Sequence, residues 1–224
     1  MSASPPLRVL YGGTFDPVHG GHLAIARCAA EVLRTRVDLM PAADPPHRGE
    51  TGASAADRVA MLRLALHGQA GLGLDLRELG RPGPSWSIDT LRELRREIGD
   101  NIALALLVGA DSFAGLPQWK SWRALFGLAH FVVASRGGDP GDASAGPELA
   151  AELADRIAVD AAELRASPGG RVLFLRQPLH AHSATEVRAR IASGQPWRQL
   201  VPAAVADYIQ AHRLYGARPG VIGH

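Results

Sequence analysis

Short runs dominated by apolar residues alternate along the chain with longer segments in which apolar residues recur at helical spacing. The run IALALLV is apolar throughout, which is typical of a strand in the middle of a parallel sheet. The stretch LGLDLREL alternates apolar and polar positions, which predicts a half-exposed strand. The predicted strands are 7–11, 37–41, 72–79, 102–108, 131–134 and 172–175.

The segments between these runs carry the helical pattern. In residues 20–33, Leu23, Ala26, Ala30 and Leu33 are available for one packed face. The predicted helices are 20–33, 55–67, 87–98 with Ser87 as its cap, 147–164, 183–193 and 202–214. Strands that alternate with helices predict an α/β fold, a doubly wound and mostly parallel sheet with helices on both faces. Ligands of such sheets bind at the carboxyl ends of the strands.

Composition indicates an ordinary soluble globular protein. The chain has 224 residues, of which 46% are hydrophobic and 21% charged, enough for a substantial core. We expect one domain over 1–224. Residues 137–170, rich in Gly, Ala, Asp and Pro, are interpreted as an insertion or surface excursion.

The net charge and the search for targeting signals limit the classes of partner that we expect. The net charge is +2, from 24 Lys plus Arg against 22 Asp plus Glu, and this scattered excess does not form the clustered basic face that nucleic-acid binding needs. The single cysteine, Cys28, excludes an internal disulfide. The first residues resemble no secretory signal, and no apolar run has membrane-spanning length. We therefore expect a cytoplasmic protein with no membrane or nucleic-acid partner.

The string GGTFDPVHGGH, residues 12–22, directly follows the first predicted strand and leads into a helix. A helix N-terminus points free backbone N–H groups at an anion, and glycines let the backbone approach a phosphate closely. His19 and His22 add donors to the same place, which predicts a polyphosphate site. Two alternatives are a zinc site, for which no third ligand lies at a recognised spacing nearby, and a structural turn with histidines capping a helix.

A second helix start carries similar chemistry. Ser183 is placed as an N-cap, and Glu186 three residues later completes the pattern of a capping box. Arg188 and Arg190 fall in the first two turns, where cations oppose the helix dipole. An anion bound at this helix start would offset that cost. The alternative is a cap with no ligand.

The first string resembles the HxGH motif of the nucleotidyltransferase superfamily, whose fold is Rossmann-like, and its longer form is similar to that of bacterial nicotinate-nucleotide adenylyltransferases. HSATEVR, residues 182–188, resembles the triphosphate-contacting motif near the C-terminus of the same superfamily. The resemblance implies catalytic roles for His19, His22 and Arg188. It also implies ATP binding by Gly12, Gly13, Thr14, Phe15, His19, Gly21, His22, Ser183, Thr185 and Arg188.

Four shorter segments are similar to the same family. They are PPHR at 45–48, with Arg where the family has Lys; PSWSIDTL at 84–91, with Trp for Tyr; GADSF at 109–113, followed by Leu116, Trp119 and Trp122; and VVASR at 132–136. They imply a mononucleotide site formed by Asp16, His47, Arg48, Trp86, Ser87, Asp111, Trp119 and Arg136. Trp119 would stack on the pyridine ring, whereas Asp16 would either shape its turn or face the substrate.

The reaction that the resemblance implies is adenylyl transfer from ATP to nicotinate mononucleotide, with Mg²⁺ bound to the phosphates and no resident metal. Alternatives are a sister transferase acting on phosphopantetheine or glycerol phosphate, an enzyme preferring the nicotinamide compound, and a nucleotide-binding protein without catalysis. A P-loop enzyme is excluded, because the chain has no GxxxxGK[ST] string. The oligomeric state stays open, with a homo-oligomer as one alternative.

Overall fold

The computed structural model describes residues 5–43, 52–81, 83, 85–135, 146–176 and 183–217. Their strands form one seven-stranded sheet in the order β3-β2-β1-β4-β5-β7-β6, with every neighbouring pair parallel. The strands are β1 (Leu7–Gly13), β2 (Val37–Pro41), β3 (Leu72–Leu74), β4 (Ala103–Gly109), β5 (His130–Ser135), β6 (Ile157–Ala158) and β7 (Val172–Arg176). The predicted doubly wound, Rossmann-like sheet is confirmed.

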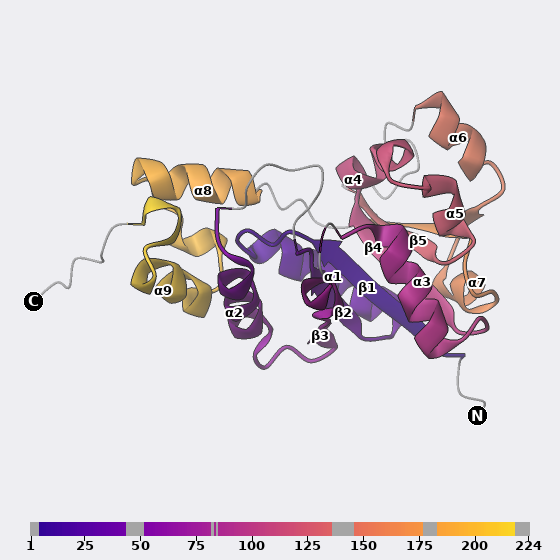
Figure 1. Cartoon of the computed structure of the whole chain (residues 1–224), viewed down its shortest axis with the longest axis horizontal. Coiled ribbons are helices and arrows are strands. Elements are labelled where there is room, and N and C mark those ends of the chain that lie inside the picture. Colours follow the sequence, from indigo (N-terminus) through magenta and orange to yellow (C-terminus); the bar gives the residue numbers. More distant parts are fainter. Residues whose placement is uncertain are drawn as a thin grey trace, which may run out of the picture.

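Helices cover both faces of this sheet, as Figure 1 shows. The α-helices are α1 (Gly20–Leu33), α2 (Ala55–Leu66), α3 (Ser87–Ile98), α4 (Ala110–Ala114), α5 (Trp122–Phe126), α6 (Pro147–Leu153), α7 (Ala161–Arg165), α8 (Ala184–Ser193) and α9 (Ala203–Ala211). The described residues also form the 3₁₀ turns η1 (Arg77–Gly80), η2 (Leu116–Gln118), η4 (Arg198–Leu200) and η5 (Leu214–Gly216).

The two faces of the sheet bury separate cores because successive strand residues point to opposite sides. In β1, Val9 belongs to the core that also contains buried residues of α1, α2, α8 and α9, whereas Leu10 belongs to the core that contains buried residues of α3, α4, α5 and α6. Figure 1 shows α8 and α9 at one end of the long axis, with α5, α6 and α7 toward the other. Within the described ranges, no helix is long and apolar enough to cross a membrane.

Two predicted elements are wrong. The strand expected over 72–79 stops at Leu74, because the Asp75 side chain accepts the Arg77 N–H and the chain turns into η1. The helix expected over 147–164 is two short helices. Between them Ile157–Ala158 pairs with β7 at the sheet edge, and Asp160 caps the second helix by accepting two N–H groups.

Two helix ends also differ from the predictions. Helix α3 has the predicted bounds, yet its N-cap is Trp86, which makes no side-chain capping bond, and Ser87 is the first helical residue. The last predicted helix, over 202–214, ends at Ala211 and continues as η5. There Arg213 and Tyr215 have φ of 53° and 56°, values outside the α-helical range.

The strand order places a ligand crevice at the end of β1. This strand lies between β2 and β4, so the chain leaves it toward one edge of the sheet and later returns on its other side. The loops at the carboxyl ends of β1 and β4 diverge at such a point, which is where doubly wound proteins bind ligands. Gly13 ends β1 and Gly109 ends β4.

Candidate nucleotide-binding site

The turn from β1 to α1 is built around the ring of Phe15. A Cβ atom at Gly13 would lie 3.0 Å from that ring, so only glycine fits there without a shift. Phe15 has a left-handed φ of 52° and is 1% exposed. Its ring contacts Tyr11 and His22 edge-on, at centroid distances of 5.5 and 5.0 Å. The Phe15 ring therefore packs beneath the turn in the protein interior, while Thr14 is partly exposed.

The two histidines are fixed by the backbone of the helix that they start. His19 is the N-cap of α1, and its Nδ1 accepts the Gly21 N–H at 3.1 Å. His22 Nδ1 in turn accepts the His19 N–H at 3.3 Å. The two rings stack at a centroid distance of 3.8 Å. The capping alternative is thus part of the structure, and it orients both rings.

This capping also determines which ring nitrogen carries the proton. A neutral imidazole has one N–H, and because Nδ1 of each ring accepts a backbone hydrogen bond, the proton of each lies on Nε2. Each Nε2–H is therefore a hydrogen-bond donor at the positive end of a 14-residue helix. The arrangement suits an anion and leaves Nδ1 unsuited to a metal.

Helix α8 starts beside the same turn. Ser183 is its N-cap and accepts the Glu186 N–H at 3.1 Å, as predicted. Arg188 Nη1 donates to the main-chain oxygen of Asp16 at 2.6 Å, while Nη2 lies 3.4 Å from Thr185 Oγ1. Arg190 pairs with Glu186 at 2.7 Å, so the two arginines of the first turns have different surroundings. The structure thus brings His19, His22 and Arg188 to one turn.

Asp16 shapes this turn. Its carboxylate is 5% exposed and accepts the N–H groups of Gly52 and Ala53 at 2.8 and 3.2 Å and the Tyr215 hydroxyl at 2.6 Å. The Arg188 guanidinium lies 3.9 Å from the same carboxylate. These contacts agree with the turn-shaping alternative.

Sequence reasoning missed Arg58 and Tyr215. Arg58 is 1% exposed and donates to the main-chain oxygens of Thr14, Ala42 and Ala43 at 2.7–2.9 Å. A signal for Arg58 existed, because it shares a helical face with Leu62 and Ala65, both buried. Tyr215 offers no local signal, since it lies 199 residues from Asp16 in the sequence.

Apart from Asp16, the predicted mononucleotide residues that the structure describes lie past β3 and β4. Trp86 and Ser87 are at the start of α3, Asp111 is exposed at the start of α4, and Trp119 is half-buried after η2. Lys120 Nζ lies 5.5 Å from the centre of the Trp86 ring and 3.4 Å from Asp89 Oδ2. His47, Arg48 and Arg136 lie outside the described residues.

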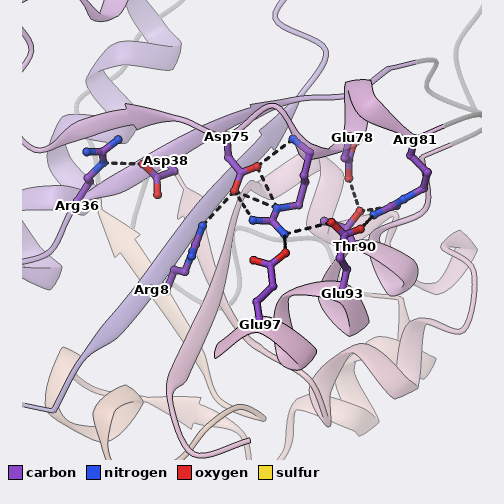
Figure 2. A network of polar contacts seen from close by, with 10 residues as sticks. Arg8, Arg36, Asp38, Asp75, Glu78, Arg81, Thr90, Glu93 and Glu97 are labelled. Carbon is purple, nitrogen blue, oxygen red and sulfur yellow. Dashed lines mark hydrogen bonds and ion pairs between the residues drawn. The ribbon is translucent and has the colours of Figure 1, made fainter. Parts of the chain in front are cut away.

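An ion-pair network, drawn in Figure 2, fastens the segment that precedes Trp86. Asp75 pairs with Arg8 of β1 at 3.1 Å and with Arg77 at 2.9 Å, and Arg77 reaches Glu97 of α3 at 2.7 Å. Arg77 also lies 3.4 Å from Glu93, which pairs with Arg81, and both Arg81 and Glu78 form hydrogen bonds with the Thr90 hydroxyl. The figure also draws the separate pair of Arg36 and Asp38. Burial alone would raise the pKa of Asp75, but the hydrogen bonds and charge of Arg77, with the charge of Arg8, lower it.

The switch point of the sheet, with two helix starts beside it, defines an anion-binding protein of the Rossmann-like class. A sequence profile of the cytidylyltransferase-like family matches residues 10–190. A Stenotrophomonas maltophilia (strain K279a) protein named "Probable nicotinate-nucleotide adenylyltransferase" is 58% identical over 214 residues, 93% of this chain and 96% of that protein. A Marinobacter nauticus protein of the same name is 46% identical, covering 95% and 98%. The chain belongs to the nicotinate-nucleotide adenylyltransferase family.

Solved structures share the fold. The Plasmodium falciparum nicotinic acid mononucleotide adenylyltransferase complexed with NaAD superposes with a TM-score of 0.70 over 95% of this chain and 98% of that one, at 14% identity. The same enzyme complexed with APC gives a TM-score of 0.68, with the same coverage and identity. At this identity the likeness is one of fold.

Proposed function

We propose that this chain transfers the adenylyl group of ATP to nicotinate mononucleotide, forming nicotinate adenine dinucleotide and pyrophosphate. The observation that carries the proposal is the stacked pair of His19 and His22, each held with its proton on Nε2 at the start of α1. Membership of the nicotinate-nucleotide adenylyltransferase family supports the choice of acceptor.

The chemistry needs positioned donors more than a base. A phosphate oxygen of the mononucleotide attacks the α-phosphorus of ATP, and the bond from that phosphorus to the α,β-bridging oxygen breaks, so the electron pair leaves with pyrophosphate. The second pKa of a phosphate monoester is about 6, so the attacking group is largely dianionic at neutral pH. Catalysis therefore consists of bringing two anions together and stabilising charge on the leaving group.

The residues of the two helix starts divide this task. His19 and His22 donate from Nε2 to the phosphate oxygens, with Gly12, Gly13, Thr14 and Gly21 forming the backbone beside them. Ser183, Thr185 and Arg188 contact the β- and γ-phosphates. The loop stays in place because Arg58 holds the Thr14 carbonyl and Arg188 the Asp16 carbonyl.

The mononucleotide lies on the β4 side of the crevice. Trp119 stacks on its pyridine ring, and Trp86, Ser87 and Asp111 line the same side, together with His47, Arg48 and Arg136 from the sequence motifs. Asp111 is exposed and lies in the first turn of α4, two residues past the end of β4, at the edge where ligands of such sheets bind.

Mg²⁺ enters this proposal with ATP. Such a cation, bound with the nucleotide, would lower the repulsion between the reacting anions. The carboxylate nearest to the turn, Asp16, already accepts three hydrogen bonds from the chain. We infer that the phosphates, and not Asp16, hold the cation. The cytoplasmic location is part of the same proposal.

Pyrophosphate release tests the proposal. The assay contains ATP and Mg²⁺ with nicotinate mononucleotide, nicotinamide mononucleotide or phosphopantetheine as acceptor. We expect the nicotinate compound to give the highest kcat/KM. Turnover of only another acceptor would preserve the phosphate site and refute the roles of Trp119 and Arg136. No turnover with any acceptor would favour a nucleotide-binding protein without catalysis.

A further inference from the structure

The C-terminal turn η5 contacts the turn between β1 and α1 through the side chain of Tyr215. Tyr215 donates its hydroxyl to Asp16 Oδ1 at 2.6 Å. Burial, followed by the hydrogen bond to Asp16 and the charge of that carboxylate, raises the pKa of Tyr215. The hydroxyl therefore keeps its proton, and remains a donor, at neutral pH.

Asp16 connects its own turn to three other segments of the chain. Its carboxylate accepts from Gly52 and Ala53, which precede α2, and from Tyr215, while its main-chain oxygen accepts from Arg188 of α8. Both the carboxylate and the main-chain oxygen of Asp16 are hydrogen-bonded. The position of the main-chain oxygen therefore depends on how firmly the side chain is held. That carbonyl is the oxygen that orients Arg188.

The packing around Tyr215 is tight. A Cβ atom at Gly52 would lie 2.9 Å from two atoms of the Tyr215 ring and 3.3 Å from Arg188 Cδ. The φ of Gly52 is not in the left-handed region, so lack of space, and not backbone conformation, is what requires glycine there. The ring of Tyr215, the backbone of Gly52 and the stem of Arg188 thus form one contact.

From this geometry we propose that Tyr215 is a positioning residue of the nucleotide site: its hydroxyl holds Asp16, and Asp16 so held presents its carbonyl to Arg188. The inference rests on the proposed role of Arg188 toward the ATP phosphates. A tyrosine that merely anchored the C-terminal segment would affect the free energy of unfolding and leave the kinetic constants of the folded enzyme unchanged.

Tyr215→Phe is the direct test, because it removes the hydroxyl and keeps the ring. We expect kcat/KM for ATP to fall about 5- to 20-fold, as for the loss of one hydrogen bond to a charged group acting through a neighbour. KM for nicotinate mononucleotide should stay within about twofold. Equal effects on both substrates, or unchanged kinetics, would overturn the proposal.

Tyr208→Phe is the matched control. Tyr208 donates its hydroxyl to Asp57 Oδ1 at 2.9 Å, so the variant removes the same kind of bond from a neighbouring C-terminal element. We expect its kinetic constants to stay within about twofold of wild type. A loss as large as that of Tyr215→Phe would mean that any loosening of the C-terminal region lowers activity, and the proposal would fail.

Gly52→Ala tests the same contact from the other side and keeps every hydroxyl. Its methyl group displaces the Tyr215 ring, so we expect the same selective loss toward ATP. Gly80→Ala is its control, because a Cβ atom there meets nothing within 4 Å. Circular dichroism and the thermal midpoint of each variant establish that the assay reports folded protein. Normal ATP kinetics in Gly52→Ala would contradict the proposal.

A double-mutant cycle on MgATP binding separates this proposal from the proposed function. If Tyr215 acts through Arg188, Tyr215→Phe weakens MgATP binding in the wild-type background and changes it less than about twofold in Arg188→Ala. Additive losses overturn the Tyr215 proposal and leave the proposed function standing. A protein that binds MgATP with this coupling but forms no dinucleotide refutes the proposed function alone, and one that binds no MgATP refutes both.

Discussion

Asp16 and Asp75 occupy similar places in the fold but have different surroundings. Each follows a parallel strand at its carboxyl end, and their side chains are 6% and 9% exposed. Asp75 is surrounded by charge, since Arg8 and Arg77 both pair with it. Asp16 is held by neutral donors, namely two backbone N–H groups and a tyrosine hydroxyl.

This difference predicts that the two aspartates affect different properties of the protein, one its stability and the other its ligand binding. Around Asp75, Arg77 forms ion pairs with Asp75 and Glu97, so its charge is neutralised within the protein. Around Asp16, the close partner of Arg188 is a carbonyl at 2.6 Å, while the carboxylate lies at 3.9 Å. A guanidinium fixed by a neutral acceptor is oriented and still attracts an anion. We therefore expect the Asp16 region to govern activity and the Asp75 region to govern stability.

The largest effect is expected in the Asp16 region, at the histidines of the turn. His19→Ala and His22→Ala each remove a donor to the phosphates, and we expect kcat to fall by about 10²–10³, as for other transition-state donors. Steady-state pyrophosphate release measures this. His67→Ala, an exposed histidine at the end of α2, is the control and should keep full activity. A fully active His22→Ala enzyme would refute the assignment of His22 to the ATP phosphates.

The next effect concerns the Asp75 region and stability. Asp75→Asn removes the carboxylate that Arg8 and Arg77 share, while Arg77 keeps its pair with Glu97. We expect the free energy of unfolding to fall by about 2 kcal/mol, less than for a fully buried pair. The kinetic constants of the folded variant should change less than about twofold. Urea unfolding combined with the pyrophosphate assay decides this. Asp16→Asn is the comparison, and it should lower activity more than stability; the reverse ranking would refute the distinction between the two regions.

The stabilisation by Asp75 also depends on pH. Because the pKa of Asp75 is lowered in the folded protein, its contribution is complete above the ordinary value of 3.8 and is lost as the pH falls below that value. We expect Asp75→Asn to lose stability less steeply than wild type on acidification.

A smaller effect is expected at the acceptor side of the crevice. Trp119→Ala should raise KM for nicotinate mononucleotide about 3- to 10-fold, the range of one aromatic stacking contact with some lost burial. KM for ATP should stay nearly constant, because Trp119 belongs to the segment that follows β4 and not to either of the two helix starts proposed to hold the phosphates. Initial-rate measurements with each substrate varied in turn test this. Equal changes in both constants would make Trp119 a purely structural residue.

The smallest effect is expected far from both aspartates, at His130 at the start of β5. Its side chain is buried, its Nδ1 accepts the Arg171 N–H at 3.0 Å, and its Nε2 lies 2.9 Å from the Ser167 carbonyl oxygen. Burial lowers the pKa of His130 from its ordinary value of 6.5. The unfolded chain therefore takes up a proton first, and stability falls as the pH decreases below 6.5. Thermal midpoints between pH 7 and 5 should show this slope in wild type and a weaker one in His130→Gln.

The local elements were predictable where periodicity and capping agree. Helix Gly20–Leu33 and strand Val37–Pro41 have their predicted bounds, because each pattern is bounded by glycine, by proline or by a reversal of the chain. Prediction failed at residues 72–79, where a side chain of the turn competes with the strand, and at 147–164, where two residues pair with the sheet edge. At residues 72–79, a hydrogen bond within the turn outweighs the local strand propensity. At residues 147–164, pairing with β7 outweighs the local helix propensity.

The sequence by itself determined the fold class, the family and the position of the turn between β1 and α1, because strand and helix periodicity and the string GGTFDPVHGGH are local properties of the chain. Only the tertiary structure decided that Asp16 shapes the turn, that Arg58 is buried beneath Thr14, and that Tyr215 reaches Asp16 across 199 positions. These contacts join segments with no sequence relation to one another. They arise because a buried carboxylate or guanidinium must find partners wherever the packed fold supplies them.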